Sequence, residues 1–202
     1  MTERAAHPSA LLFDLGGVLV EVAIFEALRT MSGKALDDDE VRERWLRSAA
    51  VRSFELGRIS PVAFASQFIA EWRVPLTPKA FLEDFGTWVK QPYAGAEALI
   101  ASLRHEYHVS CLSNCNEVHW TTMAPLLTFF DSAFSSHLLG EIKPDQAVFE
   151  KVMSELRVEP GQLWFFDDSL SNVQAAERLG IRAFQVRGVE GTKRVLRREG
   201  VL

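Results

Sequence analysis

Leu11-Leu12-Phe13-Asp14-Leu15-Gly16-Gly17 is the stretch of sequence that decides the fold. The run Leu11–Leu15 is apolar except for one carboxylate, which predicts a short buried strand, and the two glycines predict a tight turn after it. A carboxylate such as that of Asp14 is costly to bury unless it is paired or bound to a metal ion. We therefore predict that Asp14 lies at the end of a strand and has a chemical role.

From Pro92 onward, predicted helices and strands alternate strictly. The predicted strands are His108–Leu112, Ala133–Ser136, Leu163–Phe166 and Ile181–Val186, and the predicted helices are Gly95–Tyr107, Glu117–Phe129, Gln146–Leu156 and Leu170–Leu179. Apolar strands that alternate with helices are typical of a parallel sheet covered on both faces. The predicted fold class is therefore α/β, a Rossmann-like parallel sheet with helices on both faces.

Residues 21–91 have a helical pattern throughout. The predicted helical segments are Ile24–Met31, Asp37–Val51, Pro61–Trp72 and Pro78–Lys90, and both Ser60-Pro61 and Thr77-Pro78 have the N-cap and first-turn proline of a helix start. Because the strand at Leu11–Leu15 must pair with strands beyond Pro92, these helices form an insertion. We predict a core domain of residues 1–20 and 92–202 and a small all-helical cap domain of residues 21–91. The cap is expected over the carboxyl ends of the strands, where open α/β sheets bind ligands.

The composition excludes several classes of partner. The 202 residues include 22 basic and 27 acidic side chains, for a net charge of −5, and the one short basic segment, Lys193–Arg198, does not indicate nucleic-acid binding. Met1–Ala10 lacks the apolar region of a signal peptide, and no apolar run approaches bilayer length, so we expect a cytoplasmic protein without a membrane partner. Cys111 and Cys115 are too few for a disulfide framework and are interpreted as reduced thiols. The sequence leaves the oligomeric state unknown.

Four groups of polar residues follow predicted strands or begin the helices after them. They are Asp14, Ser113-Asn114, Lys143-Pro144 and Asp167-Asp168. Because the carboxyl ends of parallel strands meet at one edge of a sheet, carboxylates, an ammonium group and a hydroxyl should lie together in one crevice. Such a set predicts an oxygen-ligand site for a hard divalent cation beside donors for an anion.

These four motifs, in this order, resemble those of the haloacid dehalogenase-like hydrolase superfamily over nearly the whole chain. The matching segments are Phe13-Asp14-Leu15-Gly16-Gly17-Val18, Leu112-Ser113-Asn114, Lys143-Pro144 and Phe166-Asp167-Asp168 with Asn172. Within that superfamily, the residues of the first, second and fourth motifs are similar to those of small sugar-phosphate phosphatases with a four-helix cap. It is also similar to the phosphatase-like domain fused to mammalian epoxide hydrolase.

The resemblance implies a magnesium-dependent phosphatase acting on a small phosphorylated metabolite, with a sugar phosphate as one possibility. Asp14 would be the nucleophile and would become an aspartyl phosphate. The resemblance implies that Mg²⁺ is held by Asp14, the backbone carbonyl of Gly16 and Asp168. Asp167 would lie behind this metal site with Asn172, although the two aspartates could have exchanged places.

The phosphoryl group would be bound by the remaining motifs. The resemblance implies that Ser113 and neighbouring main-chain N–H groups, including that of Asn114, bind its oxygens. Lys143 would keep the nucleophile ionised and offset the charge that develops during transfer.

One position departs from the superfamily's phosphatases, which usually carry a second aspartate two residues after the nucleophile as acid and base. This chain has Gly16 there, and general acid–base catalysis is typically worth ~10²–10⁴-fold. We therefore expect a slow or leaving-group-selective phosphatase. His119 is a candidate substitute, with Asn116 orienting water; the alternative is that His119 only packs or caps the helix after Ser113.

The sequence leaves alternatives open for the role of two cap residues and for the function. Glu55 or Arg58, in a predicted helix–turn–helix junction, would touch the part of the substrate beyond the phosphate, or would be solvated and touch nothing. The alternative functions are a haloacid dehalogenase, which needs no metal, and a catalytically weak phosphate-binding regulatory module, which only Gly16 favours.

Overall fold

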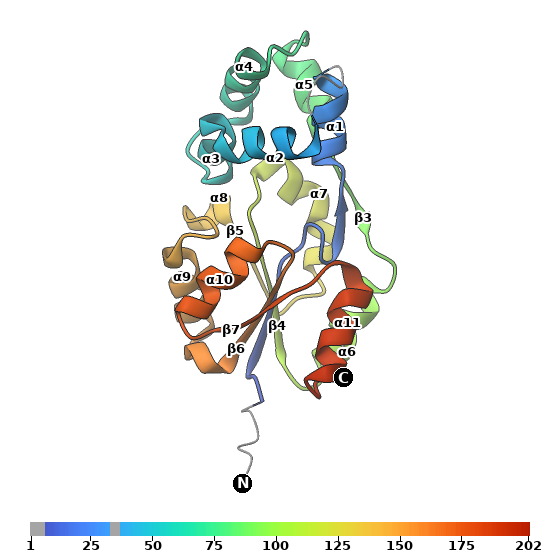
Figure 1. Ribbon diagram of the computed structural model, residues 1–202, viewed down its shortest axis with the longest axis vertical. Coiled ribbons are helices and arrows are strands. Elements are labelled where there is room, and N and C mark those ends of the chain that lie inside the picture. The colour runs from blue at the N-terminus through green and yellow to red at the C-terminus, as the bar shows by residue number, and fades with distance from the viewer. Residues whose placement is uncertain (1–6, 33–36) are drawn as a thin grey trace.

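The computed structural model describes residues 7–32 and 37–202, so part of the N-terminal segment Met1–Ala10 lies outside the described residues. A five-stranded, all-parallel sheet forms its centre, in the order β5-β4-β1-β6-β7 (Figure 1). The strands are β1 Ala10–Phe13, β4 His108–Ser113, β5 Ser132–Ser135, β6 Leu163–Asp167 and β7 Arg182–Gln185. β1 is the buried central strand, because Leu12 pairs with both Ser110 and Phe165.

Helices cover both faces of this sheet. They are α6 Ala96–Leu103, α7 Glu117–Leu127, α9 Gln146–Leu156, α10 Leu170–Arg178 and α11 Gly188–Arg198, together with the short α8 Ser136–Leu139 and the 3-10 turn Pro160–Gln162. Successive side chains of a strand point to opposite faces. Phe13 therefore packs in one core with residues of α6 and α11, and Leu12 packs in a second core with residues of α9 and α10. The predicted α/β class, with helices on both faces of a parallel sheet, is confirmed.

Two helices of the sheet domain were missed by the sequence patterns. α8 has one turn, too short for a periodic signal. α11 reads in the sequence as a basic tail, yet Val189, Thr192 and Leu196 are buried at the i, i+3 and i+7 spacing of a helix face. Charged neighbours in Lys193–Arg198 hide that apolar stripe.

A separate helical bundle lies above the carboxyl ends of the strands (Figure 1). Its helices are α1 Ile24–Met31, α2 Asp38–Arg47, α3 Ala49–Glu55, α4 Pro61–Trp72 and α5 Pro78–Phe85. Phe64, Phe68 and Phe81 lie in its aromatic core, with ring centroids 5.0–5.9 Å apart. Ser60 and Thr77 cap α4 and α5 ahead of a proline, as predicted.

The described part of the bundle has five helices where the resemblance led us to expect four. Ser48 ends the charged helix α2, and its hydroxyl accepts a hydrogen bond from the N–H of Val51, so a new helix starts there. The predicted helical segment Asp37–Val51 is therefore two helices.

The prediction that residues 21–91 are helical throughout is wrong at both ends. β2 Val20–Val22 and β3 Val89–Pro92 pair antiparallel where the chain leaves and re-enters the sheet domain. The helix predicted as Pro78–Lys90 ends at Phe85. A short apolar run does not by itself distinguish helix from strand, and here the pairing partner is about seventy residues away in the sequence.

Three of the contacts between the bundle and the sheet domain, among the described residues, involve Arg52, Gly57 and His119. Arg52 of α3 forms an ion pair with Asp145, just before α9. Gly57 (φ +68°) lies so close to the carbonyl oxygen of His137 that a Cβ atom would overlap it. The His119 ring of α7 stacks on Phe85 of α5, with centroids 4.1 Å apart.

The His119 contact also fixes the tautomer of the ring. Nε2 lies 2.8 Å from the Phe85 carbonyl oxygen, so it donates, and Nδ1 then accepts from the Asn116 amide at 3.2 Å. Burial lowers the pKa of His119 to about 4. The ring is therefore neutral. Its Nε2 joins α7 to Phe85 of α5, and its Nδ1 is held by Asn116, the N-cap residue of α7.

Two further features complete the fold. Cys111 and Cys115 are buried free thiols. Among the described residues, no helix has both the length and the apolar character that crossing a bilayer requires.

The His119 contact predicts a specific pH dependence of stability. Its pKa is lower in the folded than in the unfolded protein, so its contribution is complete above about pH 6.5 and is lost as the pH falls towards 4. The stability advantage of the wild type over His119→Phe should therefore shrink by roughly 3 kcal/mol across that range. Urea unfolding of both proteins at several pH values measures it; other titrating groups cancel in the difference. A pH-independent difference would contradict the assigned contact, and His105→Phe, at an exposed histidine, is the control.

Candidate active site

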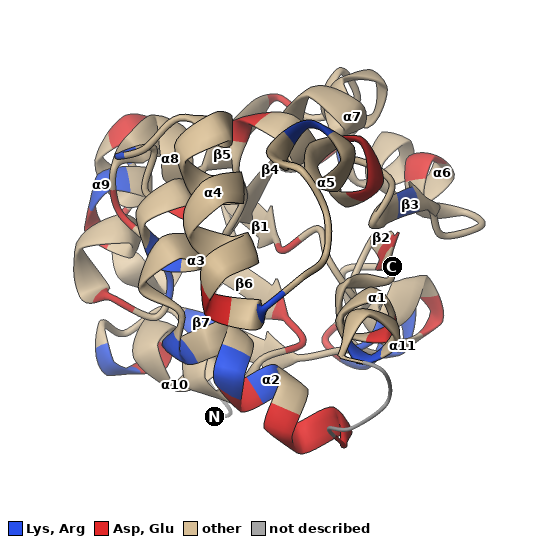
Figure 2. Cartoon of the chain, turned by 90° about the horizontal axis from the view of Figure 1, so that it is seen from above, with Lys and Arg blue, Asp and Glu red and all other residues tan. Residues whose placement is uncertain are grey.

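The polar residues predicted to converge do so at the carboxyl edge of the sheet. A cleft of about 600 Å³ lies between this edge and the bundle, and it is lined by Asp14, Ser113, Asn114, Lys143 and Asp168. Seen from the bundle side, acidic segments follow β1 and β6 directly (Figure 2). The carboxyl ends of parallel strands thus bring together residues that are far apart in the sequence.

The Lys143 ammonium group is the centre of this cleft. Its side chain is 1% exposed, and Nζ donates to Asp14 Oδ1 at 2.8 Å, to Asp167 Oδ2 at 2.7 Å and to the Leu112 carbonyl oxygen at 2.8 Å. Burial by itself would lower the pKa of Lys143, but the two carboxylates raise it above the ordinary value. The group is therefore a fixed positive charge with all three hydrogens engaged.

Asn114 holds Lys143 in place. Its amide group donates to the Lys143 carbonyl oxygen at 2.8 Å, and its Oδ1 accepts from the Lys143 N–H at 2.9 Å. The Asn114 side chain is therefore committed to the protein. The sequence-based prediction that its main-chain N–H binds a phosphoryl oxygen stays a prediction.

Asp14 follows β1 and is held there by a hydrogen bond from its own N–H to the Phe166 carbonyl oxygen at 2.8 Å. Burial raises the pKa of its carboxyl group; Lys143 lowers it in part, and the neighbouring Asp167 and Asp168 raise it again. Carboxylate oxygens of these three aspartates lie within 4.8 Å of one another. An oxygen-rich group with too little positive charge suits a hard divalent cation.

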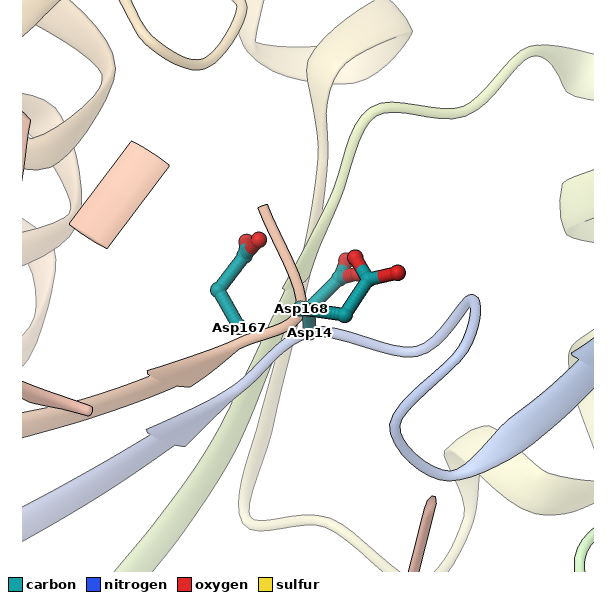
Figure 3. A group of neighbouring side chains, drawn as sticks. All are labelled: Asp14, Asp167 and Asp168. Carbon is teal, nitrogen blue, oxygen red and sulfur yellow. The ribbon is translucent and has the colours of Figure 1, made fainter. Parts of the chain in front are cut away.

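Asp167 and Asp168 differ sharply in their surroundings. Asp167 is 0% exposed and accepts hydrogen bonds from Lys143, from the Asn172 amide at 3.0 and 3.1 Å and from the Ser169 N–H at 2.8 Å. The Asp168 carboxylate accepts no hydrogen bond from the described residues. It lies beside that of Asp14, whereas Asp167 points to the other side (Figure 3).

Gly17 makes room for this arrangement. It has φ +74°, and a Cβ atom there would lie 2.7 Å from Asp168 Oδ2. Asp168 is therefore the open carboxylate next to Asp14, and Asp167 is a buried anchor for Lys143 and Asn172. This geometry favours Asp168 over Asp167 as a direct ligand of a cation.

Position 16 is sterically open. A Cβ atom on Gly16 would be 3.5 Å from Val22 Cγ1, which is an ordinary contact, and its φ is not in the left-handed region. Glycine is therefore not required here, in contrast to Gly17.

His119 and Asn116 line the cleft, but their polar atoms are already engaged. Asn116 is the N-cap of α7, with Oδ1 accepting from the His119 N–H at 3.1 Å. Both ring nitrogens of His119 have protein partners, and burial keeps the ring neutral. The structure thus favours the packing alternative over a role for His119 as acid and base.

The bundle contributes one predicted residue to the cleft and leaves out another. Glu55 lines the cleft, whereas Arg58 is exposed and is not among the residues that line it. Sequence reasoning missed Arg42 of α2 and Arg187, which also line it. Arg187 follows β7, so its position after a strand was an available signal; Arg42 is placed only by the tertiary packing of the bundle.

Comparison with known proteins agrees with this architecture. The sequence model of the haloacid dehalogenase-like hydrolases matches residues 8–180. D-ribitol-5-phosphate phosphatase of Bacteroides thetaiotaomicron is 26% identical over 185 residues, which cover 87% of this chain and 90% of that protein.

Solved structures show the same fold. A haloacid dehalogenase family enzyme of Bacteroides thetaiotaomicron, in complex with magnesium and inorganic phosphate, matches with a TM-score of 0.74 and 22% identity, covering 89% of this chain and 94% of the other. An L-2-haloacid dehalogenase matches with a TM-score of 0.65 and 21% identity, covering 89% and 85%. At these identities the likeness concerns the fold alone. The chain belongs to the haloacid dehalogenase-like hydrolase family.

Proposed function

We propose that this protein is a magnesium-dependent phosphatase that hydrolyses a small phosphorylated metabolite through an aspartyl-phosphate intermediate. The observation that carries the proposal is the geometry of Asp14, which has the Lys143 ammonium on one side and the open Asp168 carboxylate on the other. The relative that acts on D-ribitol 5-phosphate supports this class of substrate.

The cation would be held by Asp14, Asp168 and the backbone carbonyl of Gly16. These oxygens fit Mg²⁺, because the Asp168 carboxylate lacks a hydrogen-bond donor among the described residues and the three aspartates repel one another. A bound magnesium ion supplies charge neutralisation between a carboxylate nucleophile and a phosphoryl group. The related structure that contains magnesium and inorganic phosphate supports this choice of metal.

The chain's own residues perform the two displacements. Asp14 attacks phosphorus, and the bond to the ester oxygen breaks; water then attacks the aspartyl phosphate and releases inorganic phosphate. Lys143 keeps Asp14 ionised, and Ser113 binds a phosphoryl oxygen. Asn114 and Asp167 hold the Lys143 ammonium in place, so that little reorganisation is needed during the transfer.

The substrate is expected to be small because the cleft is covered. We propose that residues 21–91 act as a cap on a core of residues 1–20 and 92–202, and that this cap closes over the ligand. The 600 Å³ cleft accommodates a sugar phosphate, and Arg42 and Arg187 at its edge add positive charge for an anionic ligand.

A haloacid dehalogenase fits the fold but not the charges. That reaction has no use for the open Asp168 carboxylate beside Asp14, and leaving the three carboxylates without a cation is unfavourable. A regulatory module that binds phosphate without hydrolysing it rests only on Gly16.

Asp14→Asn tests the nucleophile. We expect wild-type protein with Mg²⁺ to release phosphate from members of a panel of phosphorylated metabolites, and the variant to be slower by roughly 10⁴-fold or more, since a covalent nucleophile is lost. Phosphate release is the measurement. Chloride release from 2-chloropropionate without phosphate release from any ester would favour the dehalogenase, and binding of phosphate without turnover would favour the regulatory module.

Asp168→Asn tests the metal ligand. Loss of one anionic ligand should raise the Mg²⁺ concentration for half-maximal activity by ~10-fold or more, with a smaller effect at saturating metal. Magnesium titrations of phosphate release measure this, and Glu177→Gln on the exposed face of α10 is the matched control. An unchanged half-saturating concentration would rule out Asp168 as a direct ligand.

A further inference from the structure

Hydrolysis of an alkyl phosphate needs a group that transfers protons. The ionisable side chains that line the cleft are those of Asp14, Arg42, Glu55, Tyr93, Cys115, His119, Lys143, Asp168 and Arg187. The Lys143 ammonium has all three hydrogens engaged, and both nitrogens of His119 have protein partners. Burial raises the pKa of the Cys115 thiol well above its usual value. The guanidinium groups of Arg42 and Arg187 carry hydrogen-bond donors and no acceptor.

Among the described residues that line the cleft, Glu55 is the one carboxyl group besides the proposed nucleophile Asp14 and the proposed metal ligand Asp168. It is the last residue of α3, is partly buried, and lines the same cleft as Asp14, Ser113 and Lys143. Within the described residues, its carboxylate forms no ion pair and accepts no hydrogen bond. A polar group that lines the cleft without a protein partner is free to contact a ligand.

Glu55 is held over the cleft by contacts on both sides of it. Three residues before it, Arg52 pairs with Asp145 of the sheet domain; two residues after it, Gly57 packs against the backbone of His137 in α8. The close approach at Gly57 admits no side chain, and its φ of +68° favours glycine. The end of α3 is therefore fixed against the sheet domain (Figure 1).

We propose that Glu55 is the general acid and base of this enzyme, supplied by the helical bundle in place of a carboxylate at position 16. The inference deepens the proposed function and rests on it. It assigns the proton transfers, which the nucleophile and the metal ligands do not explain.

As the Asp14 carboxylate oxygen bonds to phosphorus and the ester P–O bond breaks, the leaving oxygen takes the proton of the Glu55 carboxyl group. Water then bonds to phosphorus while the P–O bond to Asp14 breaks, and the Glu55 carboxylate takes a proton from that water. Inorganic phosphate leaves, and Asp14 is an ionised carboxylate and Glu55 a protonated acid once more.

The electrostatic environment of Glu55 suits this cycle. Burial raises its pKa to about 7, although the positive charges of Lys143 and Arg52 lower it in part. The other ionisable groups that line the same cleft are Asp14, Asp168 and Arg187 from the sheet domain, Tyr93 from the loop after β3, Arg42 from α2, His119 from α7 and Cys115 from the loop after β4. Near neutral pH both forms of the carboxyl group are populated, which a group that donates and then accepts a proton requires.

Glu55→Gln, assayed with Mg²⁺ on two esters, tests the proposal. For an alkyl phosphate such as glycerol phosphate, the leaving oxygen needs a proton, so kcat/KM should fall by ~10²-fold or more. For para-nitrophenyl phosphate, whose leaving group is a stable anion, kcat/KM should change by only a few-fold. Wild type should depend weakly on leaving-group pKa and the variant steeply. Glu83→Gln, an exposed glutamate of α5, is the matched control and should behave as wild type.

A rescue experiment separates proton transfer from a structural role. Since position 16 has room for a side chain, Gly16→Asp added to Glu55→Gln should restore alkyl phosphate hydrolysis by ~10-fold or more, and Gly16→Ala should not. Equal losses on both esters, or no loss on either, would overturn the inference and leave the phosphatase proposal standing. A wild-type protein inactive toward every ester would overturn both.

Discussion

The buried ammonium group of Lys143 is the interaction on which the rest of the site depends. It joins the ends of three neighbouring strands, since it contacts Asp14 after β1, Leu112 of β4 and Asp167 of β6. Removing one member of a buried ionic group leaves an uncompensated charge, which typically costs about 3–5 kcal/mol. The same contacts that position Asp14, the proposed nucleophile, therefore hold the carboxyl edge of the sheet together.

This ionic group carries more negative than positive charge. One ammonium group faces three carboxylates that lie within 4.8 Å of one another, so burial and mutual repulsion raise the pKa of both Asp14 and Asp168. Asp167 is stabilised by Lys143, Asn172 and the Ser169 N–H, and the excess negative charge falls on the pair that faces the cleft. A divalent cation at that pair would remove the repulsion and leave Asp14 ionised. The site's own electrostatics thus favour a divalent cation at that pair.

The sequence predicts the sheet and its polar edge well because both depend on local pattern. Apolar strands followed by helices predict a parallel sheet, and a parallel sheet places the carboxyl ends of its strands at one edge. The sequence alone therefore predicts that Asp14, Ser113 and Asp168 lie close together. Features that depend on distant partners were not predictable. The pairing of β2 with β3 and the burial of one face of α11 require the tertiary structure, and so does the engagement of both nitrogens of His119.

The sequence left open whether Glu55 or Arg58 faces the ligand, and the tertiary packing of the bundle decides it, because Glu55 lines the cleft and Arg58 does not. An acid at position 16 would be fixed on the loop that carries Asp14, only two residues from the proposed nucleophile. Glu55 instead sits on α3, and its distance from the reacting atoms depends on the contacts of Arg52 with Asp145 and of Gly57 with His137. Proton transfer and coverage of the cleft then require the same docked position of the bundle. If the bundle moved away to let substrate in, Glu55 would move away from the reacting atoms at the same time. Water would then reach a site without its proposed acid and base. With Glu55 in its proposed role, hydrolysis would be coupled to closure of the bundle over the cleft through the placement of one carboxyl group.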